Sequence, residues 1–358
     1  VSDTAGNAAT QASILASQDT ADPTTTISSI DISADTGSSA TDFITKTAAQ
    51  TITATLSASL ASGETLQISI NGGSSWANDD HATADGTSVS AAGYTLSGSS
   101  SIQMRIVDAA ANDGAASSQA YTLDTTAPTL GTVGIATDGS GNSNNGDTIT
   151  LTFTADEEIQ TPTCTISDAG NNALDNSGSM AVNNPSGNTW TCAVTTGDND
   201  ANGAVTFSIA YTDVGGTAGN ADTSVDDGSS VTIDNAHPTA SAVTIAVSGS
   251  GNANNGDVVT LTIDPSEAIG TPTCTWTDGS GAMADTSVTY GTTGVDSHTA
   301  AVTVADADED GAVGFSCTFS DTAGNAVASA VTALTAGSAI TIDNTHPSIT
   351  GVTAAWGT

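Results

Sequence analysis

The stretch GAVTFSIAYTD (residues 203–213) alternates apolar and polar side chains from Val205 onward. Val205, Phe207, Ile209 and Tyr211 therefore share one face of an expected strand. Comparable alternating stretches recur along the chain, separated by Gly- and Asn-containing turn signals at intervals of roughly 8 to 12 residues. Because no convincing helical period accompanies them, the pattern predicts an all-β fold of sandwiches with about seven strands each.

The chain is an internal repeat. The phrase YTLDTTAPT (121–129) returns as VTIDNAHPT (231–239) and ITIDNTHPS (340–348), which places Asp124, Asp234 and Asp343 at equivalent positions. A hairpin phrase precedes the linker as SDTAGN (2–7), GTAGN (216–220) and SDTAGN (320–325). The repeats predict five pieces: the last hairpin of a preceding domain (1–22), three complete domains (23–128, 129–238 and 239–347), and the first strand of a following domain (348–358).

The second repeat carries GDTITLTFTADEEIQTPTCTI, NTWTCAVTT and GAVTFSIAYTD, and the third carries counterparts from Gly256 to Asn344. These stretches resemble the tandem bacterial Ig-like repeats of very large secreted adhesins and cell-surface proteins. The first repeat, TDFITKTAAQTITATLSASLASGETLQISINGGSSW (41–76), resembles a sister group of such repeats. The resemblance implies an all-β fold of tandem Ig-like β-sandwiches, arranged as an extended rod, outside the cell.

The charge of the chain restricts its partners. Of 358 residues, 39 are acidic and only two, Lys46 and Arg105, are basic, which gives a formal net charge of −37. Such a field repels phosphates, so nucleic acid and anionic lipid are not expected partners, whereas cations are. No apolar run long enough to span a membrane is present, and no direct membrane insertion is expected. The alternative is that the charge serves solubility alone.

Four cysteines lie at inward-facing positions of expected strands. Cys164 and Cys274 are equivalent in their repeats and should lie one domain length apart, too far for a disulfide. The expected pairs are therefore Cys164 with Cys192 and Cys274 with Cys317. Two complete pairs indicate an oxidising, extracellular location; the alternative is four reduced core cysteines.

Acidic loops recur as DNDANG (198–203) and DADEDG (306–311). Neither loop is an EF-hand, because the position that would need a Glu is Ile209 in one and Cys317 in the other. Topology predicts that acids of two successive domains converge at each junction, where calcium would neutralise them, as the family resemblance also implies. The alternative is solvated loops with Asx-turns. The expected oxygen ligands are Asp198, Asp200, Asn202, Asp306, Asp308, Asp310, Asp147, Asp257, Asp234, Asp343, Glu157, Glu267, Asp213 and Asp321.

No set of residues suggests catalysis. The four histidines do not cluster with a nucleophile, and the Gly-rich stretch DGSGNSNNGD (138–147) is typical of a strand connector rather than a phosphate loop. The sequence therefore predicts a non-enzymatic structural segment, a calcium-stiffened adhesin stalk or filament shaft, whose partners are neighbouring repeats and possibly other copies. The alternative functions are a surface-layer (S-layer) lattice that concentrates cations and a filament subunit completed by strand exchange.

Overall fold

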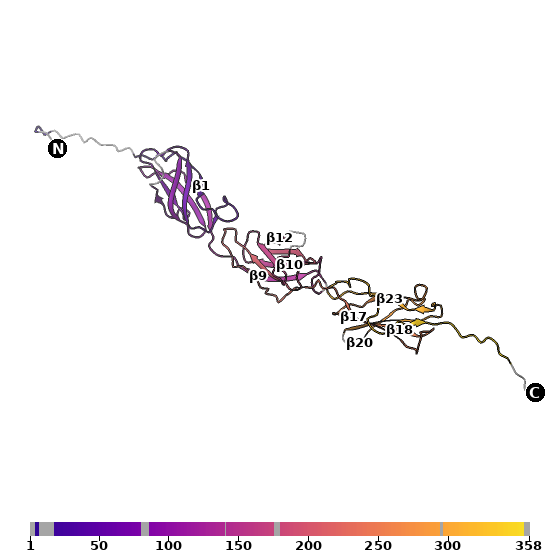
Figure 1. Ribbon diagram of the computed structural model, residues 1–358. Coiled ribbons are helices and arrows are strands. Elements are labelled where there is room, and N and C mark those ends of the chain that lie inside the picture. The colour runs from indigo at the N-terminus through magenta and orange to yellow at the C-terminus, as the bar shows by residue number, and fades with distance from the viewer. Residues whose placement is uncertain are drawn as a thin grey trace, which may run out of the picture. The chain divides into compact units, whose positions relative to one another are not determined.

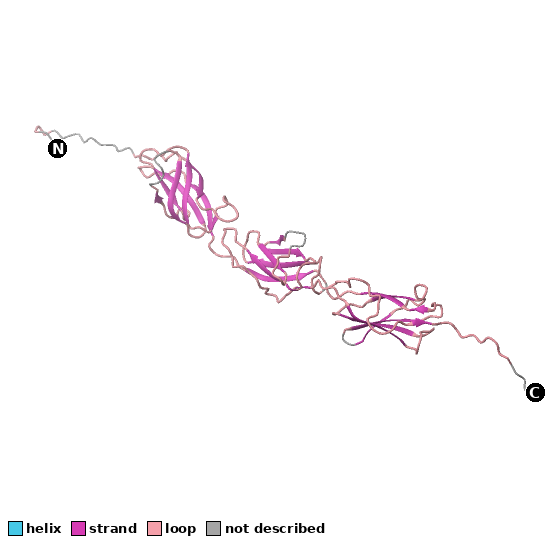
Figure 2. Ribbon diagram, viewed as in Figure 1, coloured by secondary structure: helices cyan, strands magenta, loops and turns pink. Residues whose placement is uncertain are grey.

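The computed structural model describes residues 4–6, 18–79, 86–139, 141–174, 180–293 and 296–353. These residues form strands, turns and loops, without a helix (Figure 2). Among them, accordingly, no helix has the length and hydrophobicity that a membrane crossing requires. The strands form several small sheets, so the predicted all-β class is confirmed. Within each of the ranges 23–128, 129–238 and 239–347 the described residues form eight strands, some of only two residues, where about seven were expected.

The chain divides into two compact units. Unit 1 comprises Val1–Leu130, Ala155–Thr163 and Ala210–Ala221, and unit 2 comprises Gly131–Thr154, Cys164–Ile209 and Asp222–Thr358. Unit 1 thus includes two loops that the sequence places in the second repeat. The boundaries of the five predicted pieces remain a prediction, and much of 1–22 and the end of 348–358 lie outside the described residues.

Unit 1 contains a sandwich of two sheets. One has the order β1-β3-β6, and the other has the order β2-β8-β7-β4-β5. Ile52 and Ala91 of the first sheet pack in one hydrophobic cluster with Leu66 and Met104 of the second, all of them fully buried. The strands are β1 (Ile27–Ile32), β2 (Ile44–Thr45), β3 (Ala49–Leu56), β4 (Thr65–Ser69), β5 (Ala77–Asn78), β6 (Ser88–Thr95), β7 (Ser100–Val107) and β8 (Ser117–Leu123).

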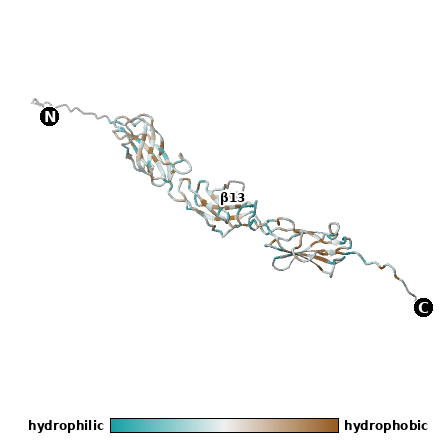
Figure 3. Ribbon diagram, in the orientation of Figure 1, coloured by the Kyte–Doolittle hydropathy of each residue, from teal (hydrophilic) through white to brown (hydrophobic). Residues whose placement is uncertain are grey.

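The next group of strands includes a four-stranded sheet, β12-β13-β10-β9, and the pair β11-β15. Phe153 on β10 lies opposite Trp190 on β13, and both are buried, as the alternation predicts. Figure 3 marks hydrophobic residues along the strands, including β13. The strands are β9 (Leu130–Thr137), β10 (Thr148–Ala155), β11 (Thr163–Ser167), β12 (Ala181–Ser186), β13 (Thr189–Thr195), β14 (Gly203–Ala204), β15 (Thr206–Ala210) and β16 (Thr232–Ile233).

The last group repeats this plan within unit 2, with a sheet β17-β18-β21-β20 and a pair β19-β23 (Figure 1). Leu261 and Val302 of the larger sheet share a core with Trp276 and Phe315 of the pair, whose rings lie 6.4 Å apart. The strands are β17 (Ala240–Val247), β18 (Val258–Pro265), β19 (Thr273–Thr277), β20 (Thr289–Thr293), β21 (Ser297–Thr303), β22 (Gly311–Ala312), β23 (Gly314–Thr318) and β24 (Thr341–Ile342).

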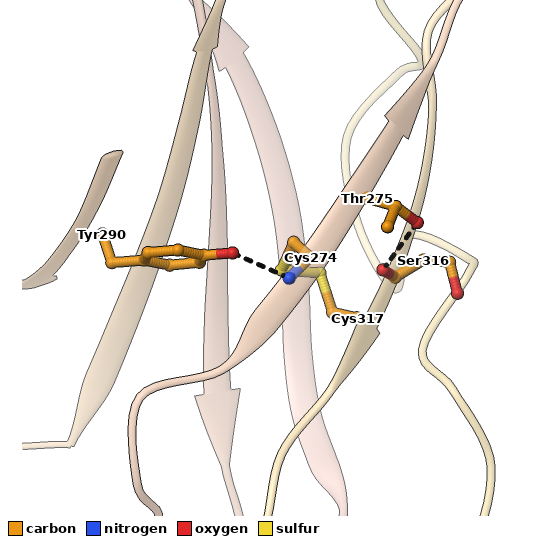
Figure 4. Close-up of a disulfide and its surroundings, with 5 residues drawn as sticks. All are labelled: Cys274, Thr275, Tyr290, Ser316 and Cys317. Atoms are coloured by element: carbon orange, nitrogen blue, oxygen red, sulfur yellow. Dashed lines mark hydrogen bonds between the residues drawn. A yellow bond between two sulfur atoms is a disulfide. The ribbon is translucent and has the colours of Figure 1, made fainter. Parts of the chain in front are cut away.

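Two disulfides join the four cysteines, Cys164 to Cys192 and Cys274 to Cys317. These are the pairs that the sequence predicts, and all four side chains are buried. The first bond joins β11 to β13, strands of different sheets, whereas the second joins β19 to β23, where Cys274 and Cys317 are direct partners in the register. Figure 4 shows the second bond, beside which the Cys274 amide donates to the Tyr290 hydroxyl at 2.9 Å.

Candidate metal centres

Two groups of three carboxylates recur at equivalent positions of the repeat. Asp124, Glu157 and Asp213 form the first group, all within unit 1. Asp234, Glu267 and Asp321 form the second, all within unit 2. In each group one oxygen of every carboxylate lies within 4.8 Å of the others. Each group thus combines one linker Asp with a Glu and an Asp that follow it in the next repeat.

The first group is held by backbone hydrogen bonds. Asp124 directly follows β8, and its amide donates to Thr45 O at 2.8 Å. Glu157 lies just beyond β10, and Asp213 lies in the turn after β15. The two loops that carry them are joined at Gln160, whose amide donates to Thr212 O and whose side chain donates to Asp213 O, both at 2.8 Å. The carboxylates are therefore positioned by the backbone around them.

Asp213 is fully buried, and one of its carboxylate oxygens has no hydrogen-bond partner. Its Oδ1 accepts from the Thr217 amide at 2.7 Å, whereas Oδ2 accepts from nothing in the described structure. Burying an unpaired charged oxygen is unfavourable by several kcal/mol unless a cation or proton compensates it. The donor set, with hard oxygens and no nitrogen or sulfur, suits calcium or magnesium rather than a transition metal.

The second group has the same backbone frame but a different neighbour. Asp234 follows β16 and its amide donates to Ser143 O, while Gly270 N donates to Ser320 O, beside Asp321. Asn325, which is buried, donates through Nδ2 to Asp321 Oδ2 at 2.9 Å and to Asp234 O at 2.7 Å. Here an amide satisfies the oxygen that is unpaired at Asp213.

Electrostatic crowding is visible in both glutamates. Burial raises the pKa of Glu157, and the neighbouring charges of Asp124 and Asp213 raise it further. Burial likewise raises the pKa of Glu267, with Asp234 and Asp321 adding to the shift. A raised carboxyl pKa means that the folded protein disfavours the ionised form. Either group would be relieved by a bound cation.

In the acidic loops DNDANG and DADEDG, side chains accept hydrogen bonds from backbone amides that flank the loops or lie farther along the chain. Asp200 Oδ2 accepts from Gly197 N at 2.7 Å, and Asn202 Oδ1 accepts from Asn235 N at 2.8 Å. Asp308, nearly fully buried, accepts from Ala284 N at 2.6 Å and from Ala305 N at 2.8 Å. Asp310 accepts from Asn344 N, and its hydrogen bonds to Thr345 and Asn344 lower its pKa.

The remaining predicted ligands lie apart from the two groups. Asp147 and Asp257 accept from the amides of Asn144 and Asn254 in their own loops. Asp306 and Asp343 line a polar cavity of about 350 Å³, and Asp198 is exposed. Among the described residues, therefore, the structure brings together Glu157 with Asp213 and Asp234 with Glu267 and Asp321. Their role as ligands, and that of the other predicted residues, remains a prediction.

Asp124 was not among the predicted ligands. The signal that identifies it is the repeat itself, since Asp124 occupies the position of Asp234. Glu157 and Asp213 likewise occupy the positions of Glu267 and Asp321, so each group predicts the other.

Comparisons with known proteins give a limited result. No family model matches the chain, and no curated protein matches it. A structure from a 1.5-MDa bacterial ice-binding adhesin is similar, with 18% identity, coverage of 90% of this chain and 97% of that chain, and a TM-score of 0.42. A tetra-tandem repeat from the extending region of a large adhesion protein has 15% identity, covers 90% and 75%, and has a TM-score of 0.28. A titin segment has 12% identity, covers 87% and 98%, and has a TM-score of 0.31. At these TM-scores the similarities say nothing about function.

Proposed function

We propose that this chain is a non-enzymatic structural segment of an extracellular surface protein, an adhesin stalk or filament shaft in which calcium stiffens the connections between successive Ig-like repeats. The observation that carries the proposal is the recurrence of one carboxylate group at two equivalent positions, with an unpaired buried oxygen on Asp213. A calcium ion there would bind one acid from the end of one repeat and two from the next.

Calcium takes six to eight oxygen ligands. Three carboxylates supply three to six of these, depending on whether they bind through one or both oxygens, and water would supply the rest. Three negative charges around one divalent ion also explain why Glu157 and Glu267 are held near other acids rather than near Lys or Arg. The chain has only two basic residues with which to compensate 39 acids.

The disulfides support an extracellular location. Structural disulfides persist in oxidising compartments and are rare in the cytosol of most organisms. Both bonds are buried inside their cores, which is typical of structural rather than redox-active pairs.

Calorimetric titration of calcium into the chelator-treated chain tests the proposal, with Glu157→Gln and Glu158→Gln compared. Both changes remove one charge from adjacent positions, but Glu157 belongs to the carboxylate group and Glu158 is exposed. We expect Glu157→Gln to lose one binding event and Glu158→Gln to retain it. Saturation at about 100 times Kd should stabilise the protein by about 2.7 kcal/mol.

Small-angle scattering of the same samples measures stiffness directly. We expect a greater maximum dimension with calcium than with chelator. If neither calcium binding nor the scattering differs between Glu157→Gln and Glu158→Gln, the proposal is wrong. Electron microscopy separates isolated rods from a two-dimensional lattice, the arrangement expected of a surface layer.

A further inference from the structure

Unit 2 has a free sheet edge along β20 (Thr289–Thr293). β20 is the last strand of the sheet β17-β18-β21-β20, and all five of its residues are exposed (Figure 1). Its register with β21 is unbroken, from Thr289 opposite Ala301 to Thr293 opposite Ser297. Among the described residues, no hydrogen bond from another segment reaches the backbone on its outer side. Such an edge presents unpaired amides and carbonyls on which another strand can pair.

The other three outer strands of the two four-stranded sheets in the second and third repeats are protected. On β17, the Val243 amide donates to Thr335 Oγ1 at 2.7 Å, and the Thr335 amide donates back to Val243 O. On β9, the Val133 amide donates to Asp226 Oδ2 at 3.0 Å. β12 contains Pro185, which has no amide hydrogen, and its register shifts at that proline. β20 has none of these devices.

The free edge is also uncharged, although the chain is strongly acidic. Residues 286–295, between Asp285 and Asp296, include no Asp, Glu, Lys, Arg or His. Copies of a chain with a formal charge of −37 repel each other, so an exposed strand without acids is where two copies can approach most closely. At about 1 M salt the Debye length falls to about 3 Å, which removes most of the remaining repulsion. These properties favour a second copy of the chain as the partner of this edge.

We propose that β20 pairs antiparallel with β20 of a second copy, about a two-fold axis at Gly291. The contact is self-complementary, so it closes as a dimer. In this register Thr289 of each copy lies opposite Thr293 of the other, and cross-strand threonine pairs are favourable. A parallel, in-register pair would instead place Asp285 opposite Asp285 and Asp296 opposite Asp296 beyond the strand ends, which is unfavourable. The charges therefore select the antiparallel arrangement.

The side chains of β20 leave room for this pairing. The Tyr290 hydroxyl accepts from the Cys274 amide of the opposite pair, β19-β23, at 2.9 Å (Figure 4). Tyr290 therefore points toward that pair, and by alternation Thr289 and Thr293 point to the outer face of the sheet. Pairing along the strand edge joins the two four-stranded sheets into one and keeps the Tyr290 contact in place.

The experiment uses two full-length variants, Thr289→Cys and Thr293→Cys, each with one new exposed thiol. The native cysteines are all in disulfides, so the new thiols are the reactive ones. In the proposed register a Cys at 289 faces a Cys at 293 of the other copy, with Cα atoms about 5 Å apart, and a disulfide needs less than about 7 Å. Two thiols at the same position lie four residues apart along the pair, which is about 13 Å.

The contact is small, so the dimer is expected to be short-lived and covalent capture is the suitable measurement. We expect mild oxidation in about 1 M salt to link the mixed variants at least several-fold faster than either variant alone. If the mixture reacts no faster than the single variants, β20 does not pair in this way and the inference is wrong. A faster reaction of one variant alone overturns the inference as well, because it would indicate the parallel register.

Charges at the two-fold axis provide a second test. Gly291 faces itself in the proposed pair, so Gly291→Glu added to both cysteine variants places two acids together. At about 0.15 M salt, where the Debye length is about 8 Å, we expect the mixed reaction to fall at least several-fold. Gly291→Glu in one variant with Gly291→Lys in the other should restore it, and this restored mixture is the control for folding. A mixed reaction that ignores these charges overturns the inference.

No carboxylate takes part in the pairing. The same results are therefore expected in calcium and in chelator, and the inference does not depend on the proposed metal sites.

Discussion

Gly37 and Val214 meet backbone against backbone within unit 1. The Ser38 amide donates to Val214 O at 3.1 Å, and a Cβ on Gly37 would overlap that same carbonyl oxygen. Gly37 also has a φ of 102°, which side-chain-bearing residues rarely adopt. Thr36 Oγ1 adds a bond to Gly215 O at 2.7 Å. The loop at 36–38 is thereby fixed to the loop that carries Asp213.

Replacing Gly37 with Ala should separate these loops. The matched control is Gly228→Ala, because Gly228 has a φ of 75° but open space where the added Cβ would lie. We expect the control to cost about 1 kcal/mol, from backbone strain alone, and Gly37→Ala to cost about 3 kcal/mol because the overlap adds to the strain. Hydrogen exchange at the Ser38 amide provides the measurement. Equal protection of that amide in both variants would contradict the close approach.

The two carboxylate groups should differ in affinity for calcium. Asp213 Oδ2 has no partner, whereas Asp321 Oδ2 already accepts from Asn325. An ion at the second group must replace or share that hydrogen bond, so we expect it to bind about tenfold more weakly, which corresponds to about 1.4 kcal/mol. In a calorimetric titration, Glu157→Gln should remove the tighter event and Glu267→Gln the weaker one. The reverse assignment would refute the ordering.

Removing either disulfide should destabilise its own sandwich. The bonded cysteines are separated by 28 residues in the first bond and by 43 in the second. The loop-entropy model gives losses of about 3.5 and about 4 kcal/mol for the double Cys→Ala variants. Scanning calorimetry of each variant should show one transition moved to lower temperature. A variant whose transitions all stay in place would show that its disulfide does not stabilise the fold.

Asp278 should contribute to stability in acid. Backbone hydrogen bonds from Glu309, Ser280 and Gly281 lower its pKa to about 2 from its ordinary value of 3.8. Because the folded protein holds the ionised form, this stabilisation is complete above about pH 4 and is lost as the pH falls toward 2. Asp278→Asn should therefore flatten the decline of melting temperature between pH 4 and pH 2.

Asp296→Asn, which changes an exposed acid, is the control for Asp278→Asn. It should leave the acid decline of the parent chain intact. If both variants follow the parent curve, the hydrogen bonds at Asp278 do not govern acid stability.

The strand faces were predictable from the sequence, because period-two alternation determines which side chains a sheet buries. Trp190, Cys192 and Val194 alternate with threonine and alanine, and all three are buried on β13. The candidate site was only partly predictable. From equivalent positions in the repeats and from loop topology, the sequence predicted that Asp234 would lie near Glu267 and Asp321.

Spacing could not show that the carboxylate of Asp308, in the DADEDG loop, is already occupied by hydrogen bonds. Asp308 Oδ1 accepts a hydrogen bond from the amide of Ala284, a residue 24 positions earlier, and only the folded chain shows this contact. Spacing also could not show how the two turns differ. Asp213 Oδ2 has no hydrogen-bond partner in the turn that carries Thr217, whereas Asp321 Oδ2 accepts from Asn325, which stands at the matching position of its turn. The first fact depends on a hydrogen bond between segments 24 positions apart, and the second on which side chain stands four positions after the Asp of each turn.

The bond between Cys274 and Cys317 also limits how far the chain can be drawn out by force. When the ends of a sandwich are pulled apart, the tension passes through the disulfide. The 43-residue segment that the disulfide closes then bears no force and does not extend. That span would otherwise release about 150 Å of contour length at about 3.5 Å per residue. With the bridge intact, the third repeat would therefore extend by that much less under force, until a reductant cut the bridge.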